Sequence, residues 1–233
     1  MSNRAILFDL DGTIADSPLL IQKTFEIVLK RNHINASNDT IKSTIGKPLK
    51  ESFLLLLNEE DHRKADDLCN QFRKTFSREL KKVNKGLIFE GFFRLATLLK
   101  NNNIQSAIVT SKIKKSAYEI LNISQTESFF TGVFCHDMVK DGKPSPDLVN
   151  LALRDLDLDK SQVIVVGDST SDIEMANKAK VESIGVTWGV SMPLDFSRVN
   201  CTNIAESWED LTIQLGNFFM HTTGGWNGHY TKD

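Results

Sequence analysis

The chain has few cysteines and almost no excess of charge, and both shortages narrow the class of protein. Its three cysteines, Cys69, Cys135 and Cys201, are odd in number and widely spaced, and no CxxC pair is present. This usage suits reduced thiols in the cytoplasm better than a disulfide framework. The formal net charge is only -2, so the charge balance does not favour nucleic acid or an acidic membrane surface as a partner.

A long apolar run and an N-terminal leader are also missing. The apolar run 54–57 is far too short to span a bilayer. The N-terminus passes directly into a strand-like segment, which leaves no room for a signal peptide. We therefore expect a cytoplasmic protein without a membrane partner. Its 233 residues suffice for one large domain, or for a core with a smaller domain inserted.

Two carboxylates follow an apolar segment close to the N-terminus. Residues 5–8 predict a short buried strand, and Asp9 and Asp11 come where it ends. Because alternate residues of an extended segment point the same way, both carboxylates are expected to face one pocket. Gly12 allows the backbone to turn sharply and to approach a ligand. Like charges this close repel, which favours a bound cation or a raised pKa on one partner.

The segment from residue 16 to residue 85 predicts helices and no strand. Ser17 and Pro18 suit the N-cap and the first position of a helix. A long amphipathic helix follows, with an apolar stripe formed by Leu68, Phe72, Phe76 and Leu80. Its basic residues are expected to form a solvated face: Arg73, Lys74, Arg78 and Lys81. We call this segment, residues 16–85, the cap segment, because an inserted helical block can serve as a lid.

Strands and helices alternate in the rest of the chain. Strands are expected at 106–109, 132–135, 163–166 and 183–186, with helices between them. This order predicts right-handed crossovers and an α/β fold with a doubly wound parallel sheet, to which the first strand also belongs. Residues 1–15 and 86–220 are therefore the expected core, and residues 221–233 a flexible tail. Ligands of such a sheet bind at the carboxyl ends of its strands.

Polar residues follow two of these strands and lie in one connecting loop. Thr110 and Ser111 come after strand 106–109, and their hydroxyl and amide groups suit phosphate oxygens. Lys143 lies in a proline-flanked loop before a helix, where it can hold an anion, and Lys112 is the alternative for that role.

Two further carboxylates, Asp168 and Asp172, come after the strand 163–166. Together with Asp9 and Asp11 they would place four acids at one edge of the sheet. Such a cluster is destabilising without a cation, and hard oxygen ligands favour Mg²⁺.

Four segments of the chain resemble, in order, the motifs of the haloacid dehalogenase (HAD) superfamily. They are F-D-L-D-G-T at 8–13, V-T-S-K at 109–112, G-K-P-S-P-D at 142–147 and G-D-S-T-S-D at 167–172. The resemblance covers residues 1 to about 215. A helical insert between the first two motifs resembles the helical-cap subclass. The sequence 45–49, with Phe53 shortly after, resembles the cap loop of phosphoglycolate phosphatase-like members.

The resemblance implies a role for each carboxylate. Asp9 would attack phosphorus and form an aspartyl-phosphate. Asp11 would protonate the leaving oxygen and then deprotonate the hydrolytic water. Mg²⁺ would be held by Asp9, the main-chain carbonyl of Asp11 and Asp168. Asp172 would bind the ion through a water molecule or would support the other ligands.

The resemblance also implies how substrate is held. Thr110, Ser111 and Lys143 would bind the transferring phosphoryl group. The cap segment would close over the site, with Gly46 and Lys47 as candidate contacts to the leaving group. At Lys180 this sequence departs from the many relatives that turn there with glycine.

These expectations describe a Mg²⁺-dependent phosphatase acting on a small phosphorylated metabolite. The aspartate at position 11 favours phosphoryl transfer over dehalogenation. A sugar-phosphate mutase of the β-phosphoglucomutase type and a pyrophosphatase are alternatives, although the cap signature of the mutase is not found. A catalytically silent binding module is a different class, and it would be expected to have lost one or more of the acids or Lys143. Phosphoglycolate, pyrophosphate, nucleotides and sugar phosphates remain candidate substrates.

Overall fold

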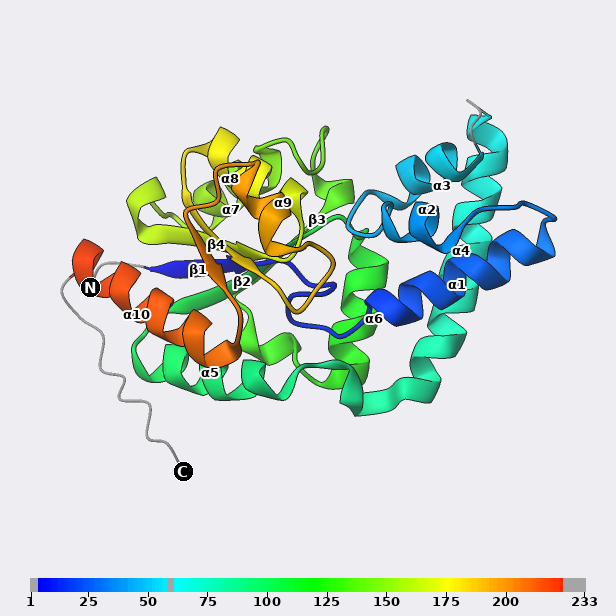
Figure 1. The fold of residues 1–233 in the computed structure, drawn as a ribbon. Helices are drawn as coiled ribbons and strands as arrows, with labels where there is room; N and C mark the ends of the chain where they lie inside the picture. The colour runs from blue at the N-terminus through cyan, green and yellow to red at the C-terminus, as the bar shows by residue number, and fades with distance from the viewer. Residues whose placement is uncertain (1–3, 58–60, 224–233) are drawn as a thin grey trace.

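The described residues of the computed structural model, 4–57 and 61–223, form an α/β core with a block of helices beside it (Figure 1). In these residues one parallel sheet has six strands in the order β3-β2-β1-β4-β5-β6. The strands are β1 Ala5–Phe8, β2 Gln105–Thr110, β3 Gly132–Cys135, β4 Val163–Gly167, β5 Glu182–Val186 and β6 Asn203–Ala205. The parallel, doubly wound arrangement predicted from the alternating pattern is confirmed.

β1 lies in the centre of the sheet, and its alternate residues enter two different cores. Ile6 and Phe8 belong to a cluster with helices α5, Glu90–Asn101, and α10, Trp208–Thr223. Ala5 and Leu7 belong to a cluster with helices α7, Asp147–Asp155, and α8, Thr170–Ala179. A strand covered on both faces is apolar throughout, and all four residues of β1 are buried.

Shorter elements complete the core. Helix α6, Lys114–Ser124, follows β2, and helix α9, Pro193–Ser197, follows β5. Short 3-10 helices lie in the connections: η1 Asn84–Leu87, η2 Glu127–Phe129, η3 His136–Met138 and η4 Lys160–Gln162. Among the described residues, no helix combines the length and the apolar character needed to cross a membrane.

The described parts of the cap segment, residues 16–57 and residues 61–85, contain helices and no strand. Its helices are α1 Pro18–Arg31, α2 Asn38–Lys42, α3 Leu49–Leu57 and α4 His62–Val83. Helices α1, α3 and α4 pack through the rings of Phe25, Phe53 and Phe72. The predicted apolar stripe of α4 is buried in this packing. Figure 1 shows these helices standing to one side of the sheet, near the carboxyl end of β1.

The predicted start of α1 is confirmed, with Ser17 at the N-cap position and Pro18 first in the helix, whereas the predicted start of the tail differs from the structure. Ser17 precedes α1, but its hydroxyl does not cap the helix; it donates instead to Asp11 Oδ1 at 2.5 Å. Helix α10 continues to Thr223, three residues into the segment predicted to be a flexible tail, and residues 224–233 lie outside the described part of the chain.

Candidate active site

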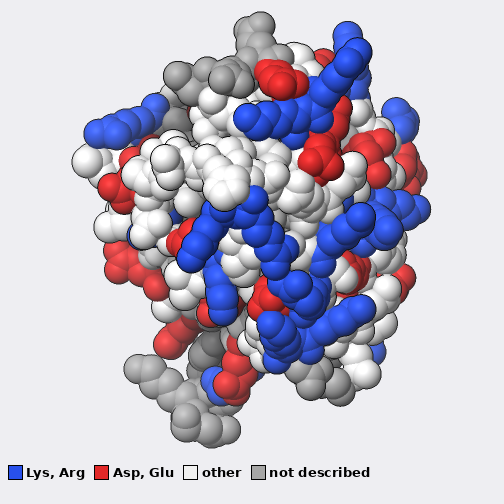
Figure 2. All heavy atoms as spheres, turned by 90° about the vertical axis from the view of Figure 1, so that its right-hand side faces the viewer, with Lys and Arg blue, Asp and Glu red and all other residues white. Residues whose placement is uncertain are grey.

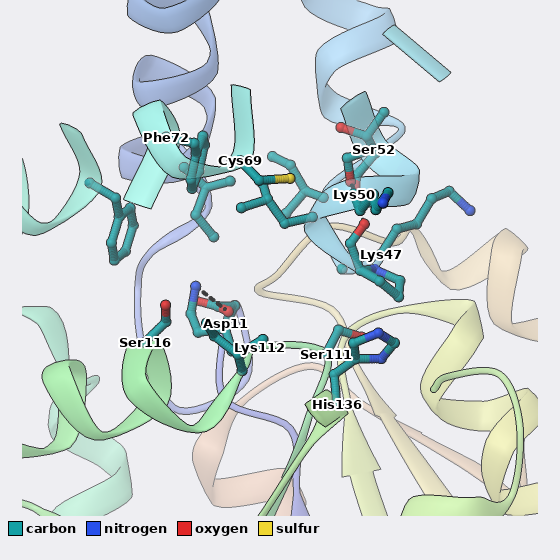
Figure 3. A pocket seen from close by; sticks show the side chains of 18 of the residues that line it. Asp11, Lys47, Lys50, Ser52, Cys69, Phe72, Ser111, Lys112, Ser116 and His136 are labelled. Atoms are coloured by element: carbon teal, nitrogen blue, oxygen red, sulfur yellow. Dashed lines mark hydrogen bonds and ion pairs between the residues drawn. The ribbon is translucent and has the colours of Figure 1, made fainter. Parts of the chain in front are cut away.

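A cavity of about 270 Å³ lies between the carboxyl ends of β1 and β2 and the helices of the cap segment (Figure 3). Asp9, Asp11 and Thr110 contribute to its wall from the core side. The opposite wall comes from α1, α4 and the loop 44–50, with Phe25, Phe72 and Phe76 among its apolar residues. The two carboxylates predicted to share a pocket therefore do so.

Three buried carboxylates lie together beneath this cavity. One oxygen from each of Asp9, Asp168 and Asp172 lies within 4.8 Å of the others. The three residues are only 6%, 2% and 1% exposed. β1 and β4 are adjacent strands, so their carboxyl ends bring Asp9 and Asp168 together, and the first turn of α8 adds Asp172.

Lys143 lies inside this group of acids. Its Nζ donates to Asp9 Oδ1 and to Asp172 Oδ1, both at 2.5 Å, and its side chain is 1% exposed. Burial opposes a charged ammonium group, but Asp172 and Asp9 outweigh it and raise the pKa of Lys143 above its ordinary value. Lys143 is therefore a fixed cation at the base of the site.

The acids still exceed this one cation in charge. Burial is the main cause that raises the pKa of Asp9 to about 7, with Lys143 lowering it and Asp172 and Asp11 raising it. Burial and the neighbouring carboxylates likewise raise the pKa of Asp168 well above its ordinary value. Three buried acids with hard oxygen donors and one ammonium group fit a divalent cation such as Mg²⁺.

Asp168 is held by two hydrogen bonds, and the backbone of Gly12 lies close to it. Thr13 Oγ1 donates to its Oδ1 at 3.0 Å, and the amide of Val190 donates to its Oδ2 at 2.9 Å. Gly12 has φ +80°, and a Cβ at that position would lie 2.2 Å from Asp168 Oδ2. The left-handed turn expected of Gly12 is therefore present, and it brings the backbone close to Asp168.

Asp172 is held by one neighbouring residue besides Lys143. The amide and hydroxyl of Ser169 both donate to Asp172 Oδ2, at 3.0 and 2.6 Å. Its two oxygens therefore point to different partners, one to the lysine and one to the start of α8.

Asp11 has partners of its own. Ser17 Oγ donates to its Oδ1 at 2.5 Å, and Lys112 Nζ lies 2.9 Å from its Oδ2 (Figure 3). The two candidate lysines thus contact different carboxylates: Lys143 contacts Asp9, and Lys112 contacts Asp11. Sequence reasoning missed Ser17 as a site residue, because Ser-Pro is a strong signal for a helix start.

The predicted phosphate-binding residues lie at the end of β2. Thr110 is buried, and its Oγ1 accepts from the amide of Lys112 at 3.2 Å. Ser111 lines the cavity, and its Oγ is a buried atom with no hydrogen-bond partner. His136, the residue after β3, also lines the cavity and was missed, although the rule that strand ends converge would have found it.

The loop that carries Gly46 and Lys47 closes the cavity from the cap side. Gly46 has φ +92°, and a Cβ there would lie 3.5 Å from the Cβ of Ser169. The loop therefore reaches the start of α8, which carries Asp172. Figure 3 shows Lys47 above Ser111 and His136, across the opening from the core.

Basic residues gather on the cap face of the molecule (Figure 2). In the predicted solvated set, Lys74, Arg78 and Lys81 are exposed. Arg73 differs, because it is half-buried and lines the cavity.

Known proteins resemble the chain over most of its length. The model of the haloacid dehalogenase-like hydrolases matches residues 6–186. Pyrophosphatase PpaX of Oceanobacillus iheyensis is 31% identical over 219 residues, which are 94% of this chain and 100% of the relative. A Dickeya dadantii protein described as "Probable phosphatase IndB" is 35% identical over 188 residues, 79% of this chain and 81% of its own.

The fold of this chain also matches the folds of solved protein structures. The crystal structure of β-phosphoglucomutase from Clostridium difficile matches with a TM-score of 0.82 at 19% identity, covering 95% of this chain and 98% of that one. Identity this low shows the fold alone. The chain belongs to the haloacid dehalogenase-like hydrolase family, as its four motifs predicted. It is a hydrolase built on the α/β core of that family.

Proposed function

We propose that the protein is a Mg²⁺-dependent phosphatase that hydrolyses a small phosphorylated metabolite through an aspartyl-phosphate on Asp9. The observation that carries the proposal is the buried group of Asp9, Asp168 and Asp172 with Lys143 inside it. A phosphoryl group brings several negative charges, so it would bind beside three carboxylates only if a bound Mg²⁺ added its positive charge to that of Lys143. The names of two relatives, a pyrophosphatase and a phosphatase, support the same reaction class.

Asp9 is the proposed nucleophile. Its carboxylate oxygen attacks phosphorus, the bond from phosphorus to the leaving oxygen breaks, and an acyl phosphate forms on Asp9. The Lys143 ammonium group, 2.5 Å from Asp9 Oδ1, favours the ionised carboxylate that this attack requires. Thr110 and Ser111, at the end of β2, supply hydroxyl and amide donors for the phosphoryl oxygens.

Asp11 is the proposed acid and base. It lines the cavity beside Asp9, and its contacts are with Ser17 and Lys112 rather than with Lys143. It would give a proton to the leaving oxygen and later take one from the water that attacks the acyl phosphate.

The residues that would hold Mg²⁺ are Asp9, the main-chain carbonyl of Asp11, Asp168 and Asp172. When bound, the ion supplies positive charge that stabilises the oxygens of the transferring phosphoryl group. Thr13, Val190 and Ser169 orient Asp168 and Asp172 for this role.

The cap segment is proposed to select the leaving group, with Gly46 and Lys47 as contacts. The cavity is of the size that suits a metabolite and has both basic and aromatic walls. Pyrophosphate is a candidate substrate because PpaX, which this chain matches over 100% of the PpaX length, is named a pyrophosphatase. A phosphoglycolate-like ester, a nucleotide and a sugar phosphate are the other candidates.

The test is phosphate release from a panel of these compounds, with Mg²⁺ or with a chelator. We expect release that requires Mg²⁺ and stops in Asp9→Asn. Isomerisation of a sugar phosphate without phosphate release would favour the mutase instead. Absence of both reactions with Mg²⁺ present would contradict an enzymatic role at this site.

A further inference from the structure

Lys112 contacts two residues that come from different parts of the fold. Its Nζ lies 2.9 Å from Asp11 Oδ2, just after β1, and 4.6 Å from the centre of the Phe76 ring, on α4 of the cap segment. The Lys112 side chain is 13% exposed and that of Asp11 is 11% exposed. Both contacts are therefore largely screened from water. Charge–charge and cation–π attractions are stronger in such a screened position than in water.

Phe76 is firmly attached to the rest of the cap segment. It is buried and stacks on Phe72 with 5.9 Å between ring centres and 12° between planes. Phe72 in turn packs against Phe25 of α1 at 4.6 Å. The position of the Phe76 ring thus follows the position of α4 and α1 as a packed unit.

Asp11 is held on both of its oxygens. Ser17, immediately before α1, donates to Oδ1, and Lys112 contacts Oδ2. One of these partners stands where the chain enters the cap segment, and the other lies under a ring of α4. The orientation of the Asp11 carboxyl is therefore set at the junction of core and cap segment.

We propose that Lys112 is a positioning residue that couples the placement of α4 to the alignment of Asp11. Phe76 holds the ammonium group over the site, and the ammonium group holds Asp11 Oδ2. Lys112 transfers no proton itself. The proposal rests on the role of Asp11 as the acid for the leaving group.

The test uses leaving groups that differ in their need for a proton. The alcohol of glycerol phosphate requires protonation as it leaves, whereas p-nitrophenolate requires little. The ratio kcat/KM reports only steps up to release of the leaving group, so hydrolysis of the aspartyl-phosphate does not enter. We expect Lys112→Met to lower kcat/KM for glycerol phosphate on the order of tenfold more than for p-nitrophenyl phosphate. Phe76→Leu should also lower kcat/KM more for glycerol phosphate than for p-nitrophenyl phosphate, but by a smaller factor than Lys112→Met.

Two further variants separate positioning from general damage. Lys112→Arg keeps the charge and can lie over the ring, so it should recover most of the lost rate. Lys114→Met is the matched control, because Lys114 lies 5.7 Å from the Tyr118 ring on α6, another lysine over an aromatic ring. Lys114→Met should leave kcat/KM for both glycerol phosphate and p-nitrophenyl phosphate unchanged. Introducing Lys112→Met into Asp11→Asn should cause no further loss, since residues that act as a unit are not additive.

Three outcomes would overturn the proposal. An equal loss on both esters would mean that Lys112 only supports the fold, and no loss would mean that it has no role. A loss seen with phosphoglycolate but not with glycerol phosphate would mean that Lys112 contacts a charged leaving group directly. A fourth result, no phosphate release by the wild-type enzyme from these three esters or from any compound of the metabolite panel, would remove the proposed function together with this inference. The first three outcomes leave the proposed function standing.

Discussion

The Lys143 ammonium group and the Asp9 carboxylate form a buried ion pair of 2.5 Å between residues 134 positions apart in the sequence. The same ammonium group holds Asp172, also at 2.5 Å. One lysine thus pairs with two of the three clustered acids. It lies in the loop between β3 and α7, whereas Asp9 follows β1 and Asp172 lies in α8.

Lys143→Ala should therefore affect both catalysis and stability. Loss of a charged group that stabilises the phosphoryl group should lower the rate on the order of 10²-fold or more. Removing one partner of a buried pair should also cost the protein about 3–5 kcal/mol without Mg²⁺. Rates and urea denaturation measure the two effects. Lys140→Ala, an exposed lysine of the same loop, is the control. A near-normal rate in Lys143→Ala would transfer the phosphate-binding role to Lys112.

Gly12→Ala tests the close approach to Asp168. The new Cβ would lie 2.2 Å from Asp168 Oδ2 at a residue with φ +80°. We expect displacement of Asp168 and a loss of activity on the order of 10²-fold. Gly86→Ala is a matched control, because a Cβ at Gly86 meets nothing within 4 Å. Equal activity of the two variants would remove Asp168 from the catalytic account.

Lys47→Ala tests the proposed contact with the leaving group. A lost charged contact should change the ratio of kcat/KM values between metabolites about tenfold or more. The rate with p-nitrophenyl phosphate should change little. Lys42→Ala, an exposed lysine of α2, serves as the control. The contact hypothesis is lost if Lys47→Ala slows all substrates by the same factor.

Lys180→Gly should stabilise the protein. Lys180 ends α8 with φ 60° and ψ 45°, a left-handed conformation in which a side chain is unfavourable. We expect a gain of about 0.5–1 kcal/mol in the free energy of unfolding. Lys178→Gly, two residues earlier and inside the same helix, should instead destabilise by about 1 kcal/mol. Midpoints of urea denaturation measure both, and a lower midpoint for Lys180→Gly would contradict the cause given.

The longer strands could be predicted because each is an apolar run bounded by turn signals. β1 and β3 begin and end at the predicted residues. β6 was not predicted, since it has only three residues and only Ala205 among them is buried. A strand this short has no pattern of its own and forms because β5 offers an open edge.

The site could be predicted in part for a similar reason. Asp9, Asp168 and Thr110 were found because parallel strands bring their carboxyl ends to one edge. Lys143 was predicted as the anion-binding lysine, with Lys112 as the alternative. Which carboxylate each lysine contacts could not be predicted, because that depends on the path of the chain between distant segments. Ser17 occupies the N-cap position that was predicted. Its contact with Asp11 was missed, because Asp11 is fixed by the turn between β1 and α1, which a local rule does not describe.

The most direct test of the account is to locate the phosphoryl group on the enzyme. Asp11→Asn should slow hydrolysis of the acyl phosphate on Asp9 more than its formation from p-nitrophenyl phosphate, so the phosphorylated enzyme should accumulate. Acid quenching followed by peptide mass spectrometry identifies the modified residue. The account predicts a phosphoryl group on Asp9 that disappears in the Asp9→Asn/Asp11→Asn variant. A phosphoryl group on any other residue, or rapid turnover by Asp9→Asn alone, would contradict it.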